Sequence, residues 1–391
     1  MTDTRKTLVR RTPWPGSVTG PIGTPLQPSV AYTAQDPDAL DALYTGQTQG
    51  FSYAREGHPN ASVLASKIDA MEGVEGGIVV GSGMAAVTAV MFGLLKSGDR
   101  VLGGTQLYGR SLRLMREELP RMGIETAFSD PTDGAAFAAA ITPGTRIVLV
   151  EVVSNPTLRV ADMHAIASAA KSAGALLVVD NTFTTPGAIR GIDVGADVVL
   201  HSVTKLLAGH SDVTLGYVHA ADPAHRKAIY DTATTFGLTP SPFDCWLAER
   251  GLFTFDLRFE RASANAAALA DALAQAAPVS RVLYPGRADH PDHARAAALL
   301  DGRFGNMVTF EIAGGREAAN RLVRAAADLP FAPTLGDVAT TLSHPASSSH
   351  RALSVAERAA IGIGEGTFRV SVGIEPPEFL LAAFRDALGA V

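Results

Sequence analysis

Short apolar runs alternate with helical segments from residue 76 to about residue 220 of this chain. The run 146–153, RIVLVEVV, is almost continuously apolar, and 175–180, ALLVVD, stays apolar until its last residue. Such runs are typical of strands that are covered on both faces by helices. Strands and helices that alternate in this way pair side by side in a mainly parallel sheet. The pattern therefore predicts an α/β fold built on a large, mainly parallel sheet.

Two segments raise the question of a membrane or a secretory signal. Residues 76–95, GGIVVGSGMAAVTAVMFGLL, contain no charge and are long enough to cross a bilayer, but the internal GSG favours a strand, a turn and a helix. The first residues, MTDTRKTLVRRTPWPG, are basic without the apolar core of a signal peptide. The single cysteine, Cys245, excludes an intramolecular disulfide and any CxxC metal site. We therefore expect a cytoplasmic protein without a membrane span or a metal.

The length of 391 residues predicts two or three structural units. Residues 1–50 are rich in Pro, Gly, Thr and Gln and indicate an extended N-terminal arm. A large domain is expected at 51–245 and a smaller C-terminal α/β domain with a mixed sheet at 246–391. The net charge of -6 and the lack of a long basic run argue against nucleic acid as a partner.

A lysine follows one of the predicted strands, in the segment HSVTKLLAGHSD at 201–212. Asn155 and Asp180 follow two other strands, and ligands of open α/β sheets collect at these carboxyl ends. Burying an ammonium group is costly, but a neutral, desolvated amine is a nucleophile that forms a Schiff base with a carbonyl cofactor. Alone, Lys205 is more typical of a solvated loop.

The cofactor that suits these residues is pyridoxal phosphate, which needs a lysine on its aldehyde and a carboxylate on its ring nitrogen. Asp180 can supply the carboxylate. The segment GSGMAA at 81–86 opens a helix, so the amides of Gly83 and Met84 can hold a phosphate, with hydroxyl donors from Ser202 and Thr204. GSGMAA lacks the third glycine of a dinucleotide fingerprint.

With these motifs the chain resembles the Cys/Met-metabolism family of pyridoxal-phosphate enzymes, which includes cystathionine γ-lyase, cystathionine γ-synthase and methionine γ-lyase. The resemblance extends over nearly the whole chain and rests on GTPLQPSVAYTA, FSYAREGHPN, GSGMAA, LYGR, VVSNPT, VVDNTFTTP, HSVTKLLAGHSDVTLG, VLYPG, TLGD, SHPASSSH and FRVSVGIE. It implies the aspartate-aminotransferase-like fold (fold type I). It also implies a homotetramer made of two catalytic dimers.

The resemblance further assigns roles to single residues. Lys205 would form the internal aldimine and move protons, Asp180 would pair with the pyridinium, and Tyr108 would stack on the ring and serve the leaving group. The phosphate would be held by Gly83, Met84, Ser202 and Thr204, and by Tyr53 and Arg55 of a neighbouring subunit.

The resemblance also indicates how a substrate would be held. Asn155 and Arg369 would face it, with Arg369 binding the α-carboxylate through a two-pronged guanidinium. A salt bridge inside the small domain is the alternative for Arg369. Thr334 stands near this site, where relatives have serine.

The expected activity is γ-elimination or γ-replacement on an S- or O-substituted homoserine, methionine or cystathionine. This is the work of a carbon–sulfur or carbon–oxygen lyase or a γ-synthase. A β-lyase acting on cystathionine or cysteine conjugates is an alternative, as is a specialised biosynthetic relative using a vinylglycine-type intermediate. A catalytically silent binding protein is a third possibility, against which the intact set of lysine, aspartate, tyrosine and arginine argues.

Several positions depart from the family pattern. Ala339 and Ser52 stand where cystathionine-processing relatives carry carboxylates, which removes partners for a distal ammonium group. Arg110 replaces the cysteine of methionine γ-lyases, and Arg113 matches an arginine of cystathionine enzymes. We therefore expect a substrate with an acidic or strongly polar γ-substituent, with interface salt bridges of the two arginines as the alternative.

Three further features have a structural interpretation beside a functional one. His58 and Asn60 replace the family's Asn and Thr, and His58 is interpreted either as a phosphate-side or interface residue or as a packed histidine. The HPDH at 290–293 is expected to be a surface loop rather than a metal pair. Cys245 is expected to be buried without a catalytic part.

Overall fold

The computed structural model describes residues 15–391, so most of the basic N-terminal segment lies outside the described residues. The larger of two sheets has seven strands in the order β1-β7-β6-β5-β4-β2-β3. They are β1 (Ile78–Val80), β2 (Arg100–Gly104), β3 (Glu125–Ser129), β4 (Thr145–Glu151), β5 (Leu176–Asp180), β6 (Val198–Ser202) and β7 (Gly216–Ala220). β7 runs opposite to the other six strands of this sheet, and all pairs without β7 are parallel, which confirms the predicted large, mainly parallel sheet.

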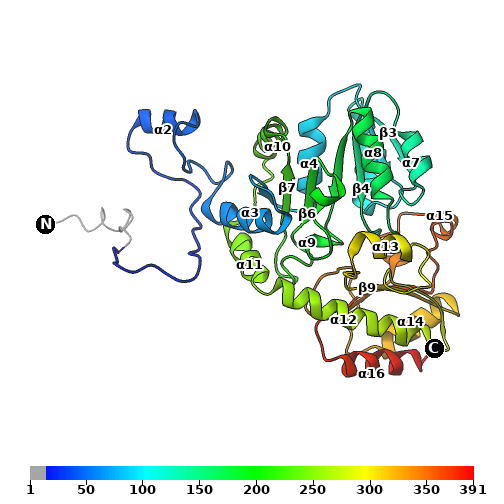
Figure 1. The fold of residues 1–391 in the computed structure, drawn as a ribbon. Coiled ribbons are helices and arrows are strands. Elements are labelled where there is room, and N and C mark those ends of the chain that lie inside the picture. The colour runs from blue at the N-terminus through cyan, green and yellow to red at the C-terminus, as the bar shows by residue number, and fades with distance from the viewer. Residues whose placement is uncertain (1–14) are drawn as a thin grey trace.

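Helices cover both faces of this sheet (Figure 1). One face packs against α3 (Pro59–Glu72), α7 (Gly134–Ala140), α8 (Met163–Ala173), α9 (Thr185–Ala188), η2 (Gly191–Val194) and α11 (Pro242–Leu252). The other packs against α4 (Gly83–Leu94), α5 (Gly109–Arg113), the π-helical turn η1 (Leu114–Glu118), α6 (Leu119–Arg121) and α10 (Pro223–Thr235). Because both faces are covered, the central strands are buried along nearly their whole length, as their continuous apolar sequences predict.

The second sheet has four strands in the order β10-β11-β9-β8. They are β8 (Val279–Leu283), β9 (Met307–Ile312), β10 (Thr341–Ser343) and β11 (Thr367–Ser371), and every pair among them is antiparallel. The expectation of a mixed sheet was therefore wrong. The helix between β8 and β9, α13 (His293–Leu300), packs on the core of the large sheet, so it makes no crossover over the small one.

The small sheet packs against α14 (Gly315–Ala325), α16 (Pro377–Leu388) and the second half of α12 (Phe255–Ala274). Phe255 and Phe259 in the first half of α12 belong instead to the core of the large sheet, so this helix ties the two cores together. The short η3 (Pro345–Ser347) and α15 (Val355–Ala360) follow β10. Residue 245 lies within α11, and the domain limits 51–245 and 246–391 stay a prediction.

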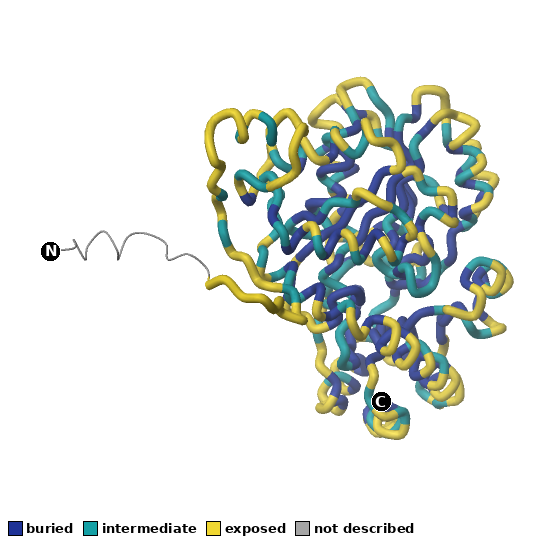
Figure 2. Tube along the Cα trace, turned by 60° about the vertical axis from the view of Figure 1, so that its left-hand side comes forward, coloured by how far each residue is buried: buried dark blue, intermediate teal, exposed yellow. Residues whose placement is uncertain are grey.

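The N-terminal arm leaves the body of the molecule (Figures 1 and 2). It docks where the indole of Trp246 donates to the Thr24 carbonyl at 2.8 Å and where the Gln27 amide donates to Asn60 at 2.9 Å. The arm is extended around these contacts but also contains helix α2 (Pro37–Tyr44), which Asp36 caps. Within residues 15–391, no helix combines the length and apolar character that a membrane crossing requires.

Candidate active site

A cavity of about 900 Å³ lies where the carboxyl ends of the large sheet face the small domain. The predicted site residues that line it are Gly83, Met84, Tyr108, Arg110, Arg113, Asn155, Asp180, Ser202, Thr204, Lys205, Thr334 and Arg369. They come from seven segments spread along the chain, so only the fold brings them together. Tyr53 and Arg55 do not line this cavity, and Arg55 donates instead to the carbonyl of Thr234.

Lys205 lies in the turn that follows β6, and its peptide groups bond to Ser202 and Gly209. Gly336 packs directly against this turn: a Cβ at position 336 would lie 2.8 Å from the carbonyl carbon of Lys205, and its φ is +83°. A side chain there would push the lysine out of place. Burial, with help from the positive charge of Arg369, lowers the pKa of Lys205, so the amine is neutral more often than a solvated lysine.

Asp180 ends β5 and accepts a hydrogen bond from the Thr182 amide at 3.1 Å. Glu151 lies beside it at the end of β4, and burial raises the pKa of both carboxyls, with the charge of Asp180 raising that of Glu151 further. Glu151 also accepts a hydrogen bond from the Tyr108 amide at 2.6 Å. Glu151 was not predicted as a site residue, although it is the acidic residue within the apolar run 146–153.

The start of α4 forms an anion-binding turn. Ser82 caps the helix by accepting from the Ala85 amide at 3.0 Å, so the amides of Gly83 and Met84 remain free to face the cavity. A Cβ on Gly83 would lie 2.6 Å from the Cβ of Ser202, which explains why glycine is required at this close approach. Two helix amides and a neighbouring serine hydroxyl suit the phosphate of a cofactor.

Thr204 differs from the expectation in one respect. Its hydroxyl donates to the Leu215 carbonyl at 3.1 Å and accepts from the Leu215 amide at 3.0 Å. The hydroxyl hydrogen is therefore already engaged within the chain, and Thr204 fixes the turn between β6 and β7 beside the cavity.

Arg369 lies on β11 with its side chain at the cavity. Its guanidinium donates to the Asn155 side chain at 2.8 Å and to the Thr334 carbonyl at 2.5 Å, while Nε has no hydrogen-bond partner among the residues that the structure describes. Burial lowers its pKa to about 10. Across residues 15–391 no carboxylate pairs with Arg369, so the expected alternative of an internal salt bridge is not formed. A buried cation with a spare donor fits the carboxylate of a substrate.

We call Gly83, Asp180, Ser202 and Lys205 the inner wall of the cavity. The outer wall consists of four exposed arginines: Arg110, Arg113, Arg116 and Arg351. Arg116 and Arg351 were not predicted as site residues from the sequence.

Three of the outer arginines already have a contact within the chain. Arg113 pairs with Glu117 at 2.8 Å, Arg116 lies over the ring of Phe128, and Arg351 contacts the Ser348 carbonyl at 3.4 Å. Arg110 forms no ion pair in the described part of the chain.

His350 also lines the cavity without having been singled out from the sequence. Its Nδ1 lies 2.8 Å from the Ser349 hydroxyl. Burial, together with the charges of Arg369 and Arg358, lowers the pKa of His350 to about 4, so this ring is neutral at physiological pH.

The remaining sequence features turn out to be structural. His58 is buried, caps α3 through the Ala61 amide at 3.1 Å and contacts the Pro240 carbonyl at 3.2 Å, which is the packed alternative. His290 and Asp292 are buried too, so the expectation of a surface loop at 290–293 was wrong. Their burial follows from a contact with a distant loop that the local sequence does not reveal. Cys245 is buried, and burial raises the pKa of its thiol.

Comparisons with known proteins agree with this geometry. The family model described as Cys/Met metabolism PLP-dependent enzyme matches residues 6–389. The chain is 39% identical over 370 residues to cystathionine beta-lyase MetC of Bacillus subtilis, covering 95% of this chain and 92% of the relative. It is 36% identical over 372 residues to L-methionine gamma-lyase of Pseudomonas putida, covering 95% and 93%.

One solved structure is similarly close. Cystathionine gamma synthase from Xanthomonas oryzae pv. oryzae, in complex with cystathionine, superposes with a TM-score of 0.90 at 37% identity, covering 96% of this chain and 95% of that one. The fold is therefore fold type I, as expected. The chain belongs to the Cys/Met metabolism family of pyridoxal-phosphate-dependent enzymes, and pyridoxal phosphate is its cofactor.

Proposed function

We propose that this enzyme catalyses γ-elimination or γ-replacement on an amino acid whose γ-substituent is acidic or strongly polar. One observation carries the proposal: Lys205, Asp180 and Arg369 converge on one cavity whose outer end is lined by arginines. Relatives that act on γ-substituted amino acids support it, among them L-methionine gamma-lyase and, at 37% identity over 382 residues, O-succinylhomoserine sulfhydrylase of Pseudomonas aeruginosa.

The inner wall suits the cofactor. Lys205 would hold its aldehyde, Asp180 its ring nitrogen, and the amides of Gly83 and Met84 its phosphate, together with the Ser202 hydroxyl. Bound pyridoxal phosphate supplies an electron sink for negative charge that develops on the carbon bearing the amino group.

Two side chains are placed to move protons. Because burial and Arg369 lower the pKa of Lys205, its free amine is a competent base toward a proton on Cα and then on Cβ of a bound amino acid. Tyr108 lines the same cavity, and its backbone is fixed by Glu151, so its phenol would deliver a proton to the departing group.

The substrate would be oriented by its α-carboxylate. Arg369 is buried, held by Asn155 and Thr334, and retains a donor without a partner. A carboxylate that met this guanidinium would form charge-assisted hydrogen bonds in a site screened from water. The γ-carbon of the bound amino acid would then extend from the inner wall toward the outer one.

The outer wall would select the γ-substituent. Arg110 is the arginine best suited to an anionic group, since Arg113 is already paired with Glu117. Ala339 and Ser52 offer no carboxylate to a distal ammonium group, so an acidic substituent is favoured over that of cystathionine. Interface salt bridges of Arg110 are the alternative.

The test is a product screen on the purified holoenzyme. O-acylated and O-phosphorylated homoserine, methionine and cystathionine are each supplied with and without a thiol nucleophile. 2-Oxobutanoate indicates γ-elimination, and a new thioether in the presence of the thiol indicates γ-replacement. Pyruvate would instead support β-elimination, the second candidate, which the similarity to cystathionine beta-lyase keeps open.

We also propose that the active assembly is a homotetramer of two catalytic dimers. The support lies in the arm, where Val18 and Ile22 are fully exposed, and in Tyr53 and Arg55, which lie outside the chain's own cavity. These two residues would complete the phosphate site of a neighbouring subunit. Light scattering tests the oligomeric state. Mixing the inactive Lys205→Ala and Arg55→Ala proteins tests the shared site, because mixing restores activity only if Lys205 of one subunit and Arg55 of another belong to the same active site.

A further inference from the structure

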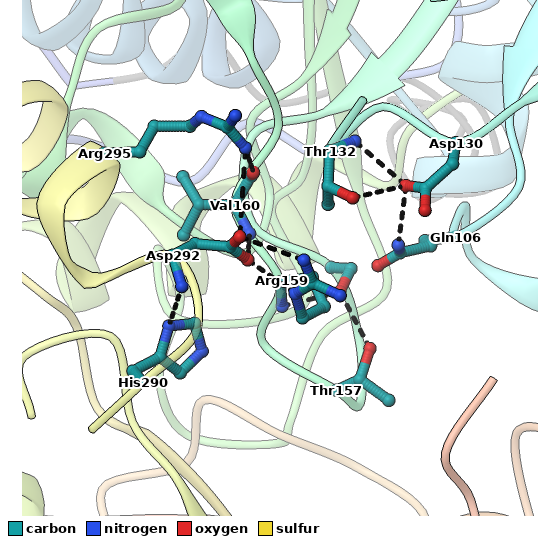
Figure 3. Close-up of polar contacts among 10 residues, drawn as sticks. Gln106, Asp130, Thr132, Thr157, Arg159, Val160, His290, Asp292 and Arg295 are labelled. Carbon is teal, nitrogen blue, oxygen red and sulfur yellow. Dashed lines mark hydrogen bonds and ion pairs between the residues drawn. The ribbon is translucent and has the colours of Figure 1, made fainter. Parts of the chain in front are cut away.

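A buried polar cluster joins the loop 154–160 to the turn that precedes α13 (Figure 3). The Asp292 carboxylate accepts from Arg159 twice, from Nε at 2.6 Å and from Nη2 at 3.0 Å. It also accepts from the amide of Val160 at 3.0 Å. Three donors on one buried carboxylate make this a strong contact between residues 132 and 133 positions apart in sequence.

The turn itself is held in place by its own residues (Figure 3). The amide of Asp292 donates to Nδ1 of the buried His290 at 3.1 Å, and Arg295 donates to the Val160 carbonyl at 2.8 Å. The amide of Val160 is thus bound by Asp292 of this turn, and its carbonyl by Arg295 of α13. Burial opposes ionisation of Asp292, yet the hydrogen bonds from Arg159 and Val160 outweigh it and keep the pKa of Asp292 below its ordinary value.

Hydrogen bonds within the loop 154–160 connect Arg159 to the cavity. Ser154 is joined to Arg159 twice: its amide donates to the Arg159 carbonyl at 2.9 Å, and its hydroxyl accepts from the Arg159 amide at 3.0 Å. The next residue, Asn155, accepts the hydrogen bond of Arg369 at 2.8 Å. Thr309 holds the other side of the loop by donating to the Pro156 carbonyl at 2.5 Å.

We infer that Asp292 is a positioning residue for substrate binding: by fixing Arg159 it sets the place of Asn155, and through Asn155 the orientation of the Arg369 guanidinium that receives the α-carboxylate. The inference rests on the proposed function of Arg369. Asp292 touches neither the cavity nor the cofactor-binding residues. Its loss should therefore weaken the binding of the amino acid and leave the binding of the cofactor intact.

The experiment uses the holoenzyme and L-norvaline, an amino acid of suitable length with no γ leaving group. Binding is followed through the visible absorbance of the cofactor. We expect Asp292→Asn to raise the Kd of norvaline about tenfold, the range typical of residues that orient a ligand-binding group, with unchanged cofactor occupancy. Arg159→Gln should have the same effect, and the double variant should be no worse than either single one. Arg159→Lys should restore part of the affinity.

Arg287→Gln is the matched control. Arg287 precedes the same turn and pairs with Asp289 and Asp271, but it makes no contact with the loop 154–160. Its loss should leave the Kd of norvaline unchanged. If Asp292→Asn does not fold, Arg159→Gln decides, because the Arg159 side chain is 32% exposed and tolerates the change better.

A Kd within twofold of wild type for the folded Asp292 variant, or for Arg159→Gln where it decides, would overturn the inference. An equal loss in the Arg287→Gln control would do the same, because the effect would then come from general disturbance of the turn. A wild-type protein that bound no cofactor, or bound it without responding to norvaline, would contradict the proposed function instead.

Discussion

The inner and outer walls of the cavity are built by different means. Residues of the inner wall follow strands of the large sheet or begin a helix beside it, and they are at least half buried. Residues of the outer wall are exposed arginines on α5, on the π-helical turn η1 and on the segment after η3. A lysine whose pKa is lowered by burial has to lie in a buried position such as the inner wall. The exposed charges of the outer wall are screened by solvent, so their replacement should be tolerated. We therefore expect the inner wall to determine the reaction and the outer wall to determine its selectivity.

Removing the inner lysine should have the largest effect. We expect Lys205→Ala to lower kcat by about 10³-fold or more, because both a covalent anchor and a mobile base are lost. The measurement is steady-state production of keto acid. Lys227→Ala is the control, since Lys227 is exposed and pairs with Asp231 on the surface. Comparable losses in both variants would contradict the role assigned to Lys205.

Arg369 should come next. Arg369→Gln removes a buried, hydrogen-bonded cation, so kcat/KM should fall about 100-fold, mainly through KM. Arg385→Gln on the exposed side of α16 should change neither constant. If kcat fell while KM did not, the guanidinium would not serve the α-carboxylate as proposed.

The outer wall should show a smaller and selective effect. Arg110→Ala should reduce the preference for acidic over neutral γ-substituents about tenfold, because one attractive charge near the substituent is lost. The measurement is the ratio of kcat/KM for O-phosphohomoserine and methionine. Arg121→Ala is the control, because Arg121 is an exposed arginine that pairs with Glu118 and lies outside the cavity lining. It should leave this ratio unchanged. An unchanged ratio would remove Arg110 from the account and favour an interface role.

The smallest effect concerns pH. The charge of Arg369 lowers the pKa of the Lys205 amine, so removing that charge must raise it. We expect Arg369→Gln to move the pH midpoint for reaction of the Lys205 amine with an amine-selective reagent, measured in the cofactor-free protein, upward by less than about one unit. Arg110→Ala should leave the midpoint in place, since Arg110 is not among the groups that shift Lys205. A downward shift in Arg369→Gln would contradict the electrostatic argument.

A contrast between local and long-range contacts explains which features could be predicted from the sequence. Lys205 and Asp180 were predicted because a strand end is a local pattern that also locates a site, and ordered motifs then supported the resemblance. Glu151 was missed because its significance comes from Asp180 on the neighbouring strand. The antiparallel small sheet and the burial of Asp292 depend on where α13 packs, which is a contact with residues far away in the chain.

The proposed chemistry depends most directly on the covalent attachment of the cofactor to Lys205, and lysine labelling tests this attachment. The holoenzyme is reduced with borohydride and digested, and the peptides are assigned by mass spectrometry. Within residues 15–391, Lys205 is the one lysine that lines the cavity, so the pyridoxyl group should appear on its peptide alone. A label on Lys67, Lys171 or Lys227, or an unmodified Lys205 peptide from active enzyme, would contradict the central claim.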